Sequence, residues 1–337
     1  MYENIIIIFL IFNLPIFLFY KFITRKINLY DHDDNIRKFH KKPVPLIGGL
    51  LLIYNLIMFS FISCFIDLKL NYNYDFTNTR EYFSFYAGLV LFFLVGIYDD
   101  KFNLSANKKL SINFFLILLI ILVDENLVIK ELSFTFLENS IHLRNISYFF
   151  TIICILLFVN ALNMFDGINL QVSTYSIIIF FIFFLKDIYI FFSLIIILSL
   201  ILFLFYNFLN KGFLGDGGTQ VLAFVISYII IKSHNVDFNL NPEEIFIFLA
   251  FPGLDMFRLF IFRIINGKDP FNPDTNHMHH LISRKFNKSI AFVLIQLIII
   301  LNIVFYYLVA SKLFAIFMII ILYGMIFLIF KKESVKN

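Results

Sequence analysis

Apolar runs long enough to cross a bilayer recur from one end of this chain to the other, and no other feature constrains its fold more. A transmembrane helix needs about 20 mostly apolar residues. Charged residues make up only 15% of the 337-residue chain, whereas a soluble domain of ordinary composition carries about 25%. Inside a bilayer every backbone polar group has to be satisfied within its own segment, which favours helices. We therefore predict an all-α, polytopic integral membrane protein that forms a single domain over residues 1–337.

The apolar runs predict about eleven transmembrane helices. They are expected near residues 4–20, 46–66, 82–98, 110–123, 147–163, 170–186, 188–206, 218–232, 244–264, 290–309 and 312–330. The first run is not typical of a cleaved signal peptide, because Glu3 precedes it and Lys21, Arg25 and Lys26 follow it. We expect it to be retained as a helix.

Positive charge is distributed unevenly among the loops. Most lysines and arginines fall in one set of loops, which includes residues 21–42, 101–109 and 331–336. The positive-inside rule assigns this set to the cytoplasm, so the N-terminus is expected outside and the C-terminus in the cytoplasm. Glycines, which let a backbone approach a ligand closely, gather on the same side. We predict that a catalytic site forms there, from residues 21–45, 98–109, 164–169, 207–217 and 265–289.

Two of these loops carry carboxylates at helix ends. Asp99 and Asp100 are adjacent at the end of the third predicted span, where they repel each other and are costly to desolvate. A divalent cation would relieve that cost, and a solvated helix end is the alternative. Asn163 and Asp166 lie in the very short linker between the fifth and sixth predicted spans. They favour a pocket, with a plain helix C-cap as the alternative.

Asp216 stands among glycines just before the eighth predicted span. In such a place backbone N–H groups can receive a phosphate while the carboxylate binds a metal. The loop lacks the lysine of a Walker A motif. A flexible turn would explain the glycines but not the carboxylate.

A histidine cluster follows the ninth predicted span, with His277, His279 and His280 close behind Asp274. Such a cluster can bind zinc, or its imidazoles can contact a pyrophosphate. Only two cysteines are present, both within apolar runs, so they do not indicate a cysteine metal site.

A basic segment with Arg37, Lys38 and His40 leads through two prolines to Gly48 and Gly49. Topology alone predicts its charges, but the prolines indicate an extended approach to the second span. Anionic lipid or a lipid phosphate is a plausible partner.

In order and spacing these motifs resemble those of the polyprenyl-phosphate N-acetylhexosamine-1-phosphate transferases (glycosyltransferase family 4), over nearly the whole chain. The HxHH ending and the predicted span number resemble the WecA-like branch more than the MurNAc-pentapeptide transferases. The matching motifs are RKxHxxPxPxxGG (Arg37 to Gly49), GxxDD (Gly96 to Asp100), NxxDGxx (Asn163 to Asn169), FxGDxG (from Phe213), the Pro252, Asp255 and Arg263 elements, and PDxxHxHH (Pro273 to His280).

The resemblance implies transfer of a sugar 1-phosphate from a UDP-sugar to polyprenyl (undecaprenyl) phosphate, giving polyprenyl-diphosphate-sugar and UMP. Such a reaction starts a cell-envelope glycan, such as a cell-wall polymer or lipopolysaccharide O-antigen. It implies a bacterial cytoplasmic membrane with the site facing the cytoplasm, and Mg²⁺ as cofactor, with Mn²⁺ as an alternative. Negative charge accumulates in the reaction, which suits a divalent ion held by few carboxylates.

The resemblance also implies residue roles. Asp216 and Asp166 match metal ligands, and Asp99 and Asp100 match residues that orient or deprotonate the lipid phosphate. The full catalytic set is Asp99, Asp100, Asp166, His277, His279 and His280, and the substrate-binding set is Asn163, Asp274, Arg37, Lys38, His40 and Lys109.

This chain departs from the family pattern at Asn103, Asn169 and Thr275, which stand where two acidic residues and an arginine are usual. The departures bear on which sugar is used. A multi-pass transporter, a membrane zinc hydrolase and a purely structural subunit are the alternatives. The loop motifs at helix ends, without an internal repeat, favour the transferase over a transporter. The sequence carries no nucleic-acid-binding signature and is compatible with a homodimer.

Overall fold

The computed structural model describes residues 2–31, 43–65, 76, 78–236, 239–270 and 275–334. Most of these residues are helical, and the strands among them form two short two-stranded sheets. The chain divides into two compact units. The first unit comprises residues 1–104 and 176–222, and the second comprises residues 105–175 and 223–337.

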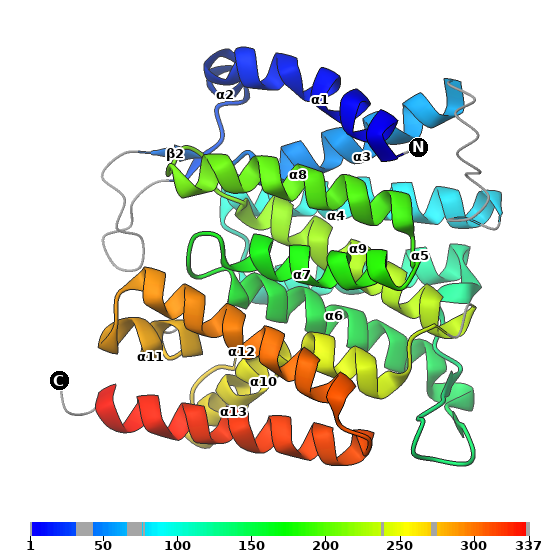
Figure 1. The fold of residues 1–337 in the computed structure, drawn as a ribbon, viewed down its shortest axis with the longest axis vertical. Coiled ribbons are helices and arrows are strands. Elements are labelled where there is room, and N and C mark those ends of the chain that lie inside the picture. Colours follow the sequence, from blue (N-terminus) through cyan, green and yellow to red (C-terminus); the bar gives the residue numbers. More distant parts are fainter. Residues whose placement is uncertain are drawn as a thin grey trace. The chain divides into compact units, whose positions relative to one another are not determined.

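The first unit is a helical bundle in which α3 packs along α8 (Figure 1). The helices that lie wholly within it are α1 (Tyr2–Leu18), α2 (Tyr20–Ile27), α3 (Gly48–Phe65), α4 (Thr79–Phe102) and α8 (Ile190–Phe208). Strands β1 (Tyr30–Asp31) and β2 (Val44–Pro45) pair antiparallel. The chain bends by 69° between α1 and α2, at the end of the first predicted span, residues 4–20.

Two buried amides join α1 to α3. Asn13 Nδ2 donates to Asn55 Oδ1 at 2.7 Å, and Asn55 Nδ2 donates back to Asn13 Oδ1 at 3.2 Å. Each amide also donates to the carbonyl oxygen four residues earlier in its own helix. Buried polar groups are costly unless they are hydrogen-bonded. The reciprocal pair therefore fixes the rotation of α1 against α3.

The second unit packs α6 against α5 and α10, and places α11 against α12 and α13 (Figure 1). Strands β3 (Glu131–Leu132) and β4 (Ile141–His142) form an antiparallel hairpin. The helices wholly within this unit are α5 (Ala106–Val123), η2 (Glu125–Leu127), η3 (Arg144–Ile146), α6 (Ser147–Phe165), α10 (Pro242–Ile265), α11 (Met278–Lys285), α12 (Lys288–Leu308) and α13 (Lys312–Ser334).

The boundaries between the units fall inside α7 (Gln171–Leu185) and α9 (Gly215–Asn235). Every residue of α9 from Gly217 to His234 is buried. A helix that is buried on all sides belongs to the core of a protein. Helix α9 is therefore a buried helix, and its first turn carries the Gly-Asp-Gly motif of the sequence analysis.

A buried ion pair joins α9 to the end of α5 within the second unit. Lys232 Nζ lies 2.9 Å from Asp124 Oδ2, and the side chains are 2% and 3% exposed. Tyr228 donates a further hydrogen bond to Asp124. Because a single buried charge is strongly unfavourable, each member of this pair depends on the other.

The structure confirms a polytopic helical membrane protein. Each of the eleven predicted segments coincides with a helix among the described residues. Within the described ranges, seven helices are long and apolar enough to cross a membrane, and eight if α1 and α2 form one bent span. The segment Gly48–Phe61 of α3 and the whole of α7 are apolar but shorter, and α9 is not among the helices that qualify. Eleven spans and the orientation of the termini therefore stay predictions.

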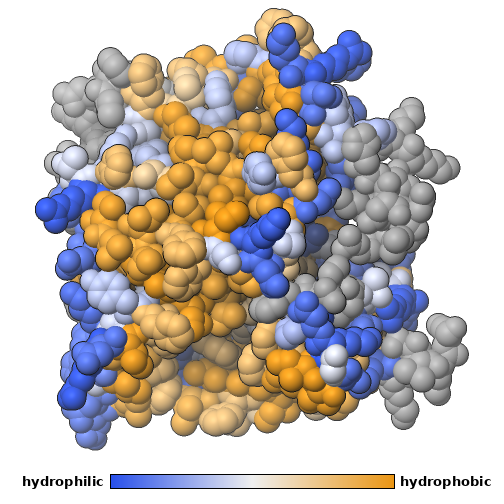
Figure 2. Space-filling view, turned by 180° about the vertical axis from the view of Figure 1, so that it is seen from behind, coloured by the Kyte–Doolittle hydropathy of each residue, from blue (hydrophilic) through white to orange (hydrophobic). Residues whose placement is uncertain are grey.

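Hydrophobic side chains cover much of the face shown in Figure 2. On α13 the exposed side chains include Leu313, Phe314, Phe317 and Leu328. Soluble monomers rarely expose large contiguous apolar patches, so such surface marks contact with lipid or a partner. On a helix long enough to span a bilayer, lipid is the simplest occupant.

Candidate functional site

The carboxylate of Asp100, at the end of α4, lies against the first turn of α9. Its Oδ1 accepts a hydrogen bond from the Asp216 N–H at 2.8 Å, and its Oδ2 accepts one from the Gly217 N–H at 3.0 Å. The first N–H groups of a helix have no partner within the helix, and its dipole favours negative charge there. Asp100, which belongs to α4, supplies the missing hydrogen-bond partners and the negative charge. The Asp216 and Gly217 N–H groups are thus bonded to Asp100, and a phosphate at backbone N–H groups of this loop stays a prediction.

Glycines bring the backbones of α3 and α4 into direct contact with the start of α9. A Cβ at Gly96 would lie 2.4 Å from Gly217 Cα, and a Cβ at Gly49 would lie 2.6 Å from the backbone nitrogen of Gly218. No side chain fits at such distances. These glycines therefore serve helix packing rather than the close approach of a ligand that the sequence suggested. Their effect on the site is indirect, because they hold Asp100 and Asp216 together.

The segment that leads into α3 pairs with the segment that leads into α9. The Phe213 N–H donates to the Pro45 carbonyl at 3.0 Å, and the Ile47 and Gly48 N–H groups both donate to the Phe213 carbonyl at 3.1 Å. Two motifs that lie far apart in the sequence thus form one patch of backbone in the first unit. The described part of the Pro-Val-Pro segment is anchored beside Asp216.

Asp99 is buried and closes the C-terminal end of α4. Its Oδ1 accepts a hydrogen bond from the Leu104 N–H at 2.7 Å. Asn103 is the C-cap of α4 and adopts the left-handed conformation, with φ of 50°. Asparagine tolerates this conformation better than most residues. The departure from the family pattern at Asn103 therefore has a local backbone reason.

In the second unit, the turn after α6 meets the histidine cluster. Asp166 is exposed and forms the C-cap of α6, with its N–H donating to the Asn163 carbonyl at 3.2 Å. A Cβ at the next residue, Gly167, would lie 1.9 Å from His279 Nε2. Only glycine leaves room for that imidazole. The structure thus brings together two motifs that the sequence placed on one membrane face.

The three imidazoles of the cluster pack on one another. The His277 and His279 rings are stacked with centroids 5.3 Å apart, and the His279 and His280 centroids lie 4.3 Å apart. Burial lowers the pKa of His279 well below its usual value, and the neighbouring imidazoles lower it further. Burial, followed by His277, lowers the pKa of His280 to about 4. Both imidazoles are therefore uncharged at neutral pH, and His279 Nε2 is buried without a hydrogen-bond partner.

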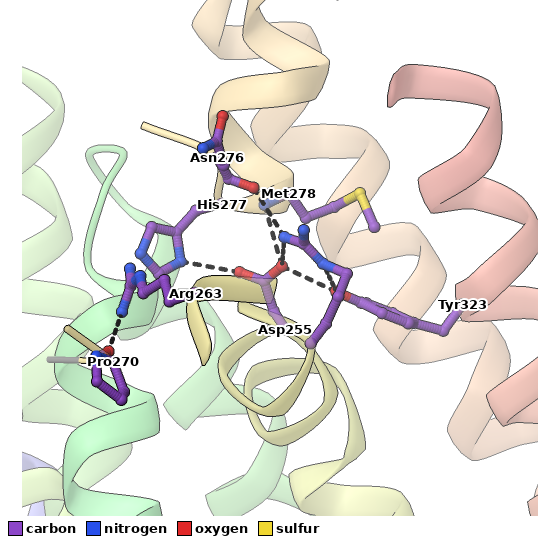
Figure 3. Close-up of polar contacts among 8 residues, drawn as sticks. Asp255, Arg263, Pro270, Asn276, His277, Met278 and Tyr323 are labelled. Atoms are coloured by element: carbon purple, nitrogen blue, oxygen red, sulfur yellow. Dashed lines mark hydrogen bonds and ion pairs between the residues drawn. The ribbon is translucent and has the colours of Figure 1, made fainter. Parts of the chain in front are cut away.

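The buried carboxylate of Asp255 in α10 organises the start of α11 (Figure 3). It accepts hydrogen bonds from His277 Nδ1 at 3.0 Å, from the Met278 N–H at 3.1 Å and from the Tyr323 hydroxyl at 2.8 Å. The Arg258 guanidinium lies 2.7 Å from the same carboxylate. Asp255 and Arg258, three residues apart, thus pair on one face of α10. The links to α11 and α13 were not foreseen.

The remaining predicted residues lie as follows. Lys109 is buried near the start of α5, and Asn169 is exposed after α6. Arg284 of α11 donates to the Thr275 carbonyl at 2.8 Å and to its Oγ1 at 3.0 Å. An arginine side chain thus lies beside the position where the family pattern has an arginine. Arg37, Lys38, His40 and Asp274 lie outside the described residues.

Within the part of the chain that the structure describes, no group of three or more His, Cys, Asp or Glu side chains is arranged to hold a metal ion. A zinc site needs three or four such ligands around one point. The His277 and His279 rings instead stack on each other, and His277 bonds to Asp255.

Comparison with known proteins decides the family. Residues 82–234 match the family model described as glycosyl transferase family 4. The undecaprenyl-phosphate alpha-N-acetylglucosaminyl 1-phosphate transferase of Escherichia coli (strain K12) is 29% identical over 317 residues, which cover 87% of this chain and 80% of that protein. The "probable undecaprenyl-phosphate N-acetylglucosaminyl 1-phosphate transferase" of Bacillus subtilis (strain 168) is 30% identical over 268 residues, covering 77% of this chain and 71% of that protein. The chain belongs to glycosyl transferase family 4. The resemblance inferred from the motifs is confirmed.

Sequence reasoning missed the contacts that Asp255 and Gly167 make with the histidine cluster. It placed Asp255 in the ninth span without a partner in the histidine motif, and it gave Gly167 no reason beyond the turn. The signal for the first was a carboxylate inside an apolar segment, which is costly unless it is bonded. Nothing in the spacing indicated that Gly167 faces His279.

Proposed function

We propose that this protein transfers an N-acetylhexosamine 1-phosphate from a UDP-sugar to polyprenyl phosphate. The observation that carries the proposal is its family membership, with relatives named as undecaprenyl-phosphate N-acetylglucosaminyl 1-phosphate transferases aligned along 77–87% of the chain. Their names favour UDP-N-acetylglucosamine as donor and undecaprenyl phosphate as acceptor. The product starts a cell-envelope glycan, and the bacterial relatives favour the cytoplasmic membrane, with the site facing the cytoplasm.

The reaction exchanges one phosphoanhydride for another. An oxygen of the lipid phosphate attacks the phosphorus that bears the sugar. The bond from that phosphorus to the bridging oxygen breaks, and UMP leaves with the electron pair. A new P–O–P bond joins lipid and sugar. Repulsion between the two anionic phosphate groups is the main barrier to this attack. Positioning and charge neutralisation therefore dominate catalysis.

Asp100 and Asp99 suit different tasks on the acceptor side. Both carboxylate oxygens of Asp100 accept hydrogen bonds from N–H groups in the first turn of α9. We therefore assign Asp100 to positioning Asp216. We assign the Asp99 carboxylate, which accepts a hydrogen bond from the Leu104 N–H, to orienting the lipid phosphate or taking its proton, as the sequence predicted.

Magnesium fits the chemistry of the proposed ligands. Asp216 and Asp166 carry carboxylates, neither of them fully buried, and Mg²⁺ prefers oxygen ligands and binds through one or two carboxylates together with substrate phosphates. We propose these two residues as its ligands. When bound, the ion would neutralise charge on the diphosphate. Mn²⁺ has similar ligand preferences.

Neutral imidazoles suit recognition of the donor. His279 and His280 are uncharged at neutral pH, so each can donate one hydrogen bond and accept another. We propose that they contact the diphosphate or sugar, with Asn163. We propose that the positive charge that binds the anionic substrates comes from Arg37, Lys38, His40 and Lys109. Asp274 is proposed to contact the sugar.

An exchange assay tests the proposal. Membranes containing the expressed protein are supplied with polyprenyl-diphosphate-sugars, radiolabelled UMP and a panel of UDP-N-acetylhexosamines, with and without Mg²⁺. We expect label to enter one UDP-sugar only when Mg²⁺ is present. The Asp216→Asn variant should fold and show no exchange, and full activity in that variant would overturn the metal assignment.

A further inference from the structure

The hydrogen bonds to Asp255 are divided unequally between its two oxygens. The Arg258 guanidinium, the Met278 N–H and the Tyr323 hydroxyl all donate to Oδ1, at 2.7, 3.1 and 2.8 Å. Oδ2 has His277 Nδ1 at 3.0 Å (Figure 3). The carboxylate is 3% exposed and lies within α10, so its orientation is set by these partners from three helices.

An ionised carboxylate only accepts hydrogen bonds, so the nitrogen that faces it has to carry a proton. We propose that Asp255 is a positioning residue that selects the Nδ1–H tautomer of His277, which leaves Nε2 to accept a hydrogen bond from the substrate. The inference rests on the proposed function, because it assigns His277 to the transferase site. Asp255 lies in the ninth predicted span, so the site is shaped by a helix interior as well as by the loops.

The surroundings of His277 support this assignment. The His279 ring stacks on His277, and its pKa is held well below the usual value, so it adds no charge at neutral pH. His280 lies against His279 and is also neutral. The charged groups around the cluster are Asp255 and Arg258, which bond to each other, and Arg284 and Lys288, which act on His280. Among the described residues, the contact that decides the tautomer is the one between His277 Nδ1 and Asp255 Oδ2.

The unequal division predicts what an amide would do at this position. In Asp255→Asn the three donors at Oδ1 keep the carbonyl oxygen on their side. The amide NH₂ then takes the place of Oδ2 and points at His277 Nδ1. Because the NH₂ group only donates, His277 has to accept at Nδ1 and carry its proton on Nε2. The substitution therefore reverses the tautomer while it preserves size and the three supporting bonds.

Tyr323→Phe is the matched control. It removes one hydrogen bond to the same carboxylate but leaves Oδ2 and His277 untouched. A role of Asp255 in packing alone predicts that the two variants behave alike. A role through the tautomer predicts that only Asp255→Asn changes His277.

Nitrogen NMR of the ¹⁵N-histidine-labelled protein in lipid nanodiscs at pH 9 tests the tautomer directly, with His277 assigned by its absence in His277→Gln. We expect the Nδ1–H form in the unmodified protein and in Tyr323→Phe, and the Nε2–H form in Asp255→Asn. An Nε2–H form in the unmodified protein would overturn the proposal even if the asparagine variant does not fold.

Exchange activity supplies the second readout. We expect kcat to fall by at least about 100-fold in Asp255→Asn, as expected when a catalytic histidine is held in the wrong tautomer, and by less than about threefold in Tyr323→Phe. Equal losses in both variants would reduce Asp255 to a packing role. If the unmodified protein shows no exchange but the NMR result is as expected, the proposed function fails while the tautomer assignment stands.

Discussion

Replacing Gly96 by alanine should separate Asp100 from the start of α9. The added Cβ would lie 2.4 Å from Gly217 Cα and 2.5 Å from the Asp216 carbonyl oxygen, whereas ordinary contact begins near 3.4 Å. The α4 and α9 backbones would have to move apart by about 1 Å. Overpacking of this kind costs about 1–3 kcal/mol. A shift of that size also breaks hydrogen bonds of 2.8 and 3.0 Å to Asp100, and each bond to a charged group contributes about 1.5–3 kcal/mol.

The measurement is thermal unfolding of the purified protein in detergent, together with UMP exchange. Gly96→Ala should unfold at a lower temperature and lose at least about 100-fold in exchange. Gly324→Ala is the control, because a Cβ there meets nothing within 4 Å, and alanine in a helix is favoured over glycine by about 1 kcal/mol. If the two variants are equally stable and equally active, the close packing of α4 on α9 does not hold the site.

Three further predictions follow from the second unit. Gly167→Ala should displace His279, whose Nε2 lies 1.9 Å from the new Cβ, and raise the KM for the UDP-sugar in steady-state assays; an unchanged KM would show that the imidazole does not contact the donor. Lys232→Met should cost about 3–5 kcal/mol, since it leaves Asp124 buried and unpaired, and an unchanged melting temperature in detergent would contradict this. Because the pKa of His280 is lowered to about 4, the unfolded chain binds a proton that the folded chain does not between about pH 6.5 and 4. Stability should therefore fall as pH drops through that range, and His280→Asn should flatten the fall in melting temperature.

The helices of this fold could be predicted from the sequence because a bilayer leaves the backbone few choices. Each apolar run became a helix, and the order of the loop motifs identified the family. Chain length and hydropathy could not show the 69° bend between α1 and α2. Nor could they show that α9 is buried on all sides, because an apolar helix looks the same whether lipid or protein surrounds it.

The partners of the site residues could be predicted only in part. The sequence placed Asp100 and Asp216 on one membrane face, but no spacing indicated that the carboxylate of one bonds to the backbone of the other. The tie between Asp255 and His277 was hidden for the same reason, because it joins a helix interior to a loop. Long-range pairing depends on how helices pack, and the pattern of a single helix does not record it. The glycines were recognised as special, but the close contact they allow is with another helix.

The most direct test of the transferase is product formation by the purified protein in nanodiscs that contain undecaprenyl phosphate. UDP-N-acetylglucosamine and Mg²⁺ are added, and mass spectrometry follows UMP and the lipid product. The account predicts equal amounts of UMP and undecaprenyl-diphosphate-N-acetylglucosamine, and neither from Asp216→Asn. A folded preparation that forms no lipid-linked diphosphate sugar from any UDP-N-acetylhexosamine would contradict it.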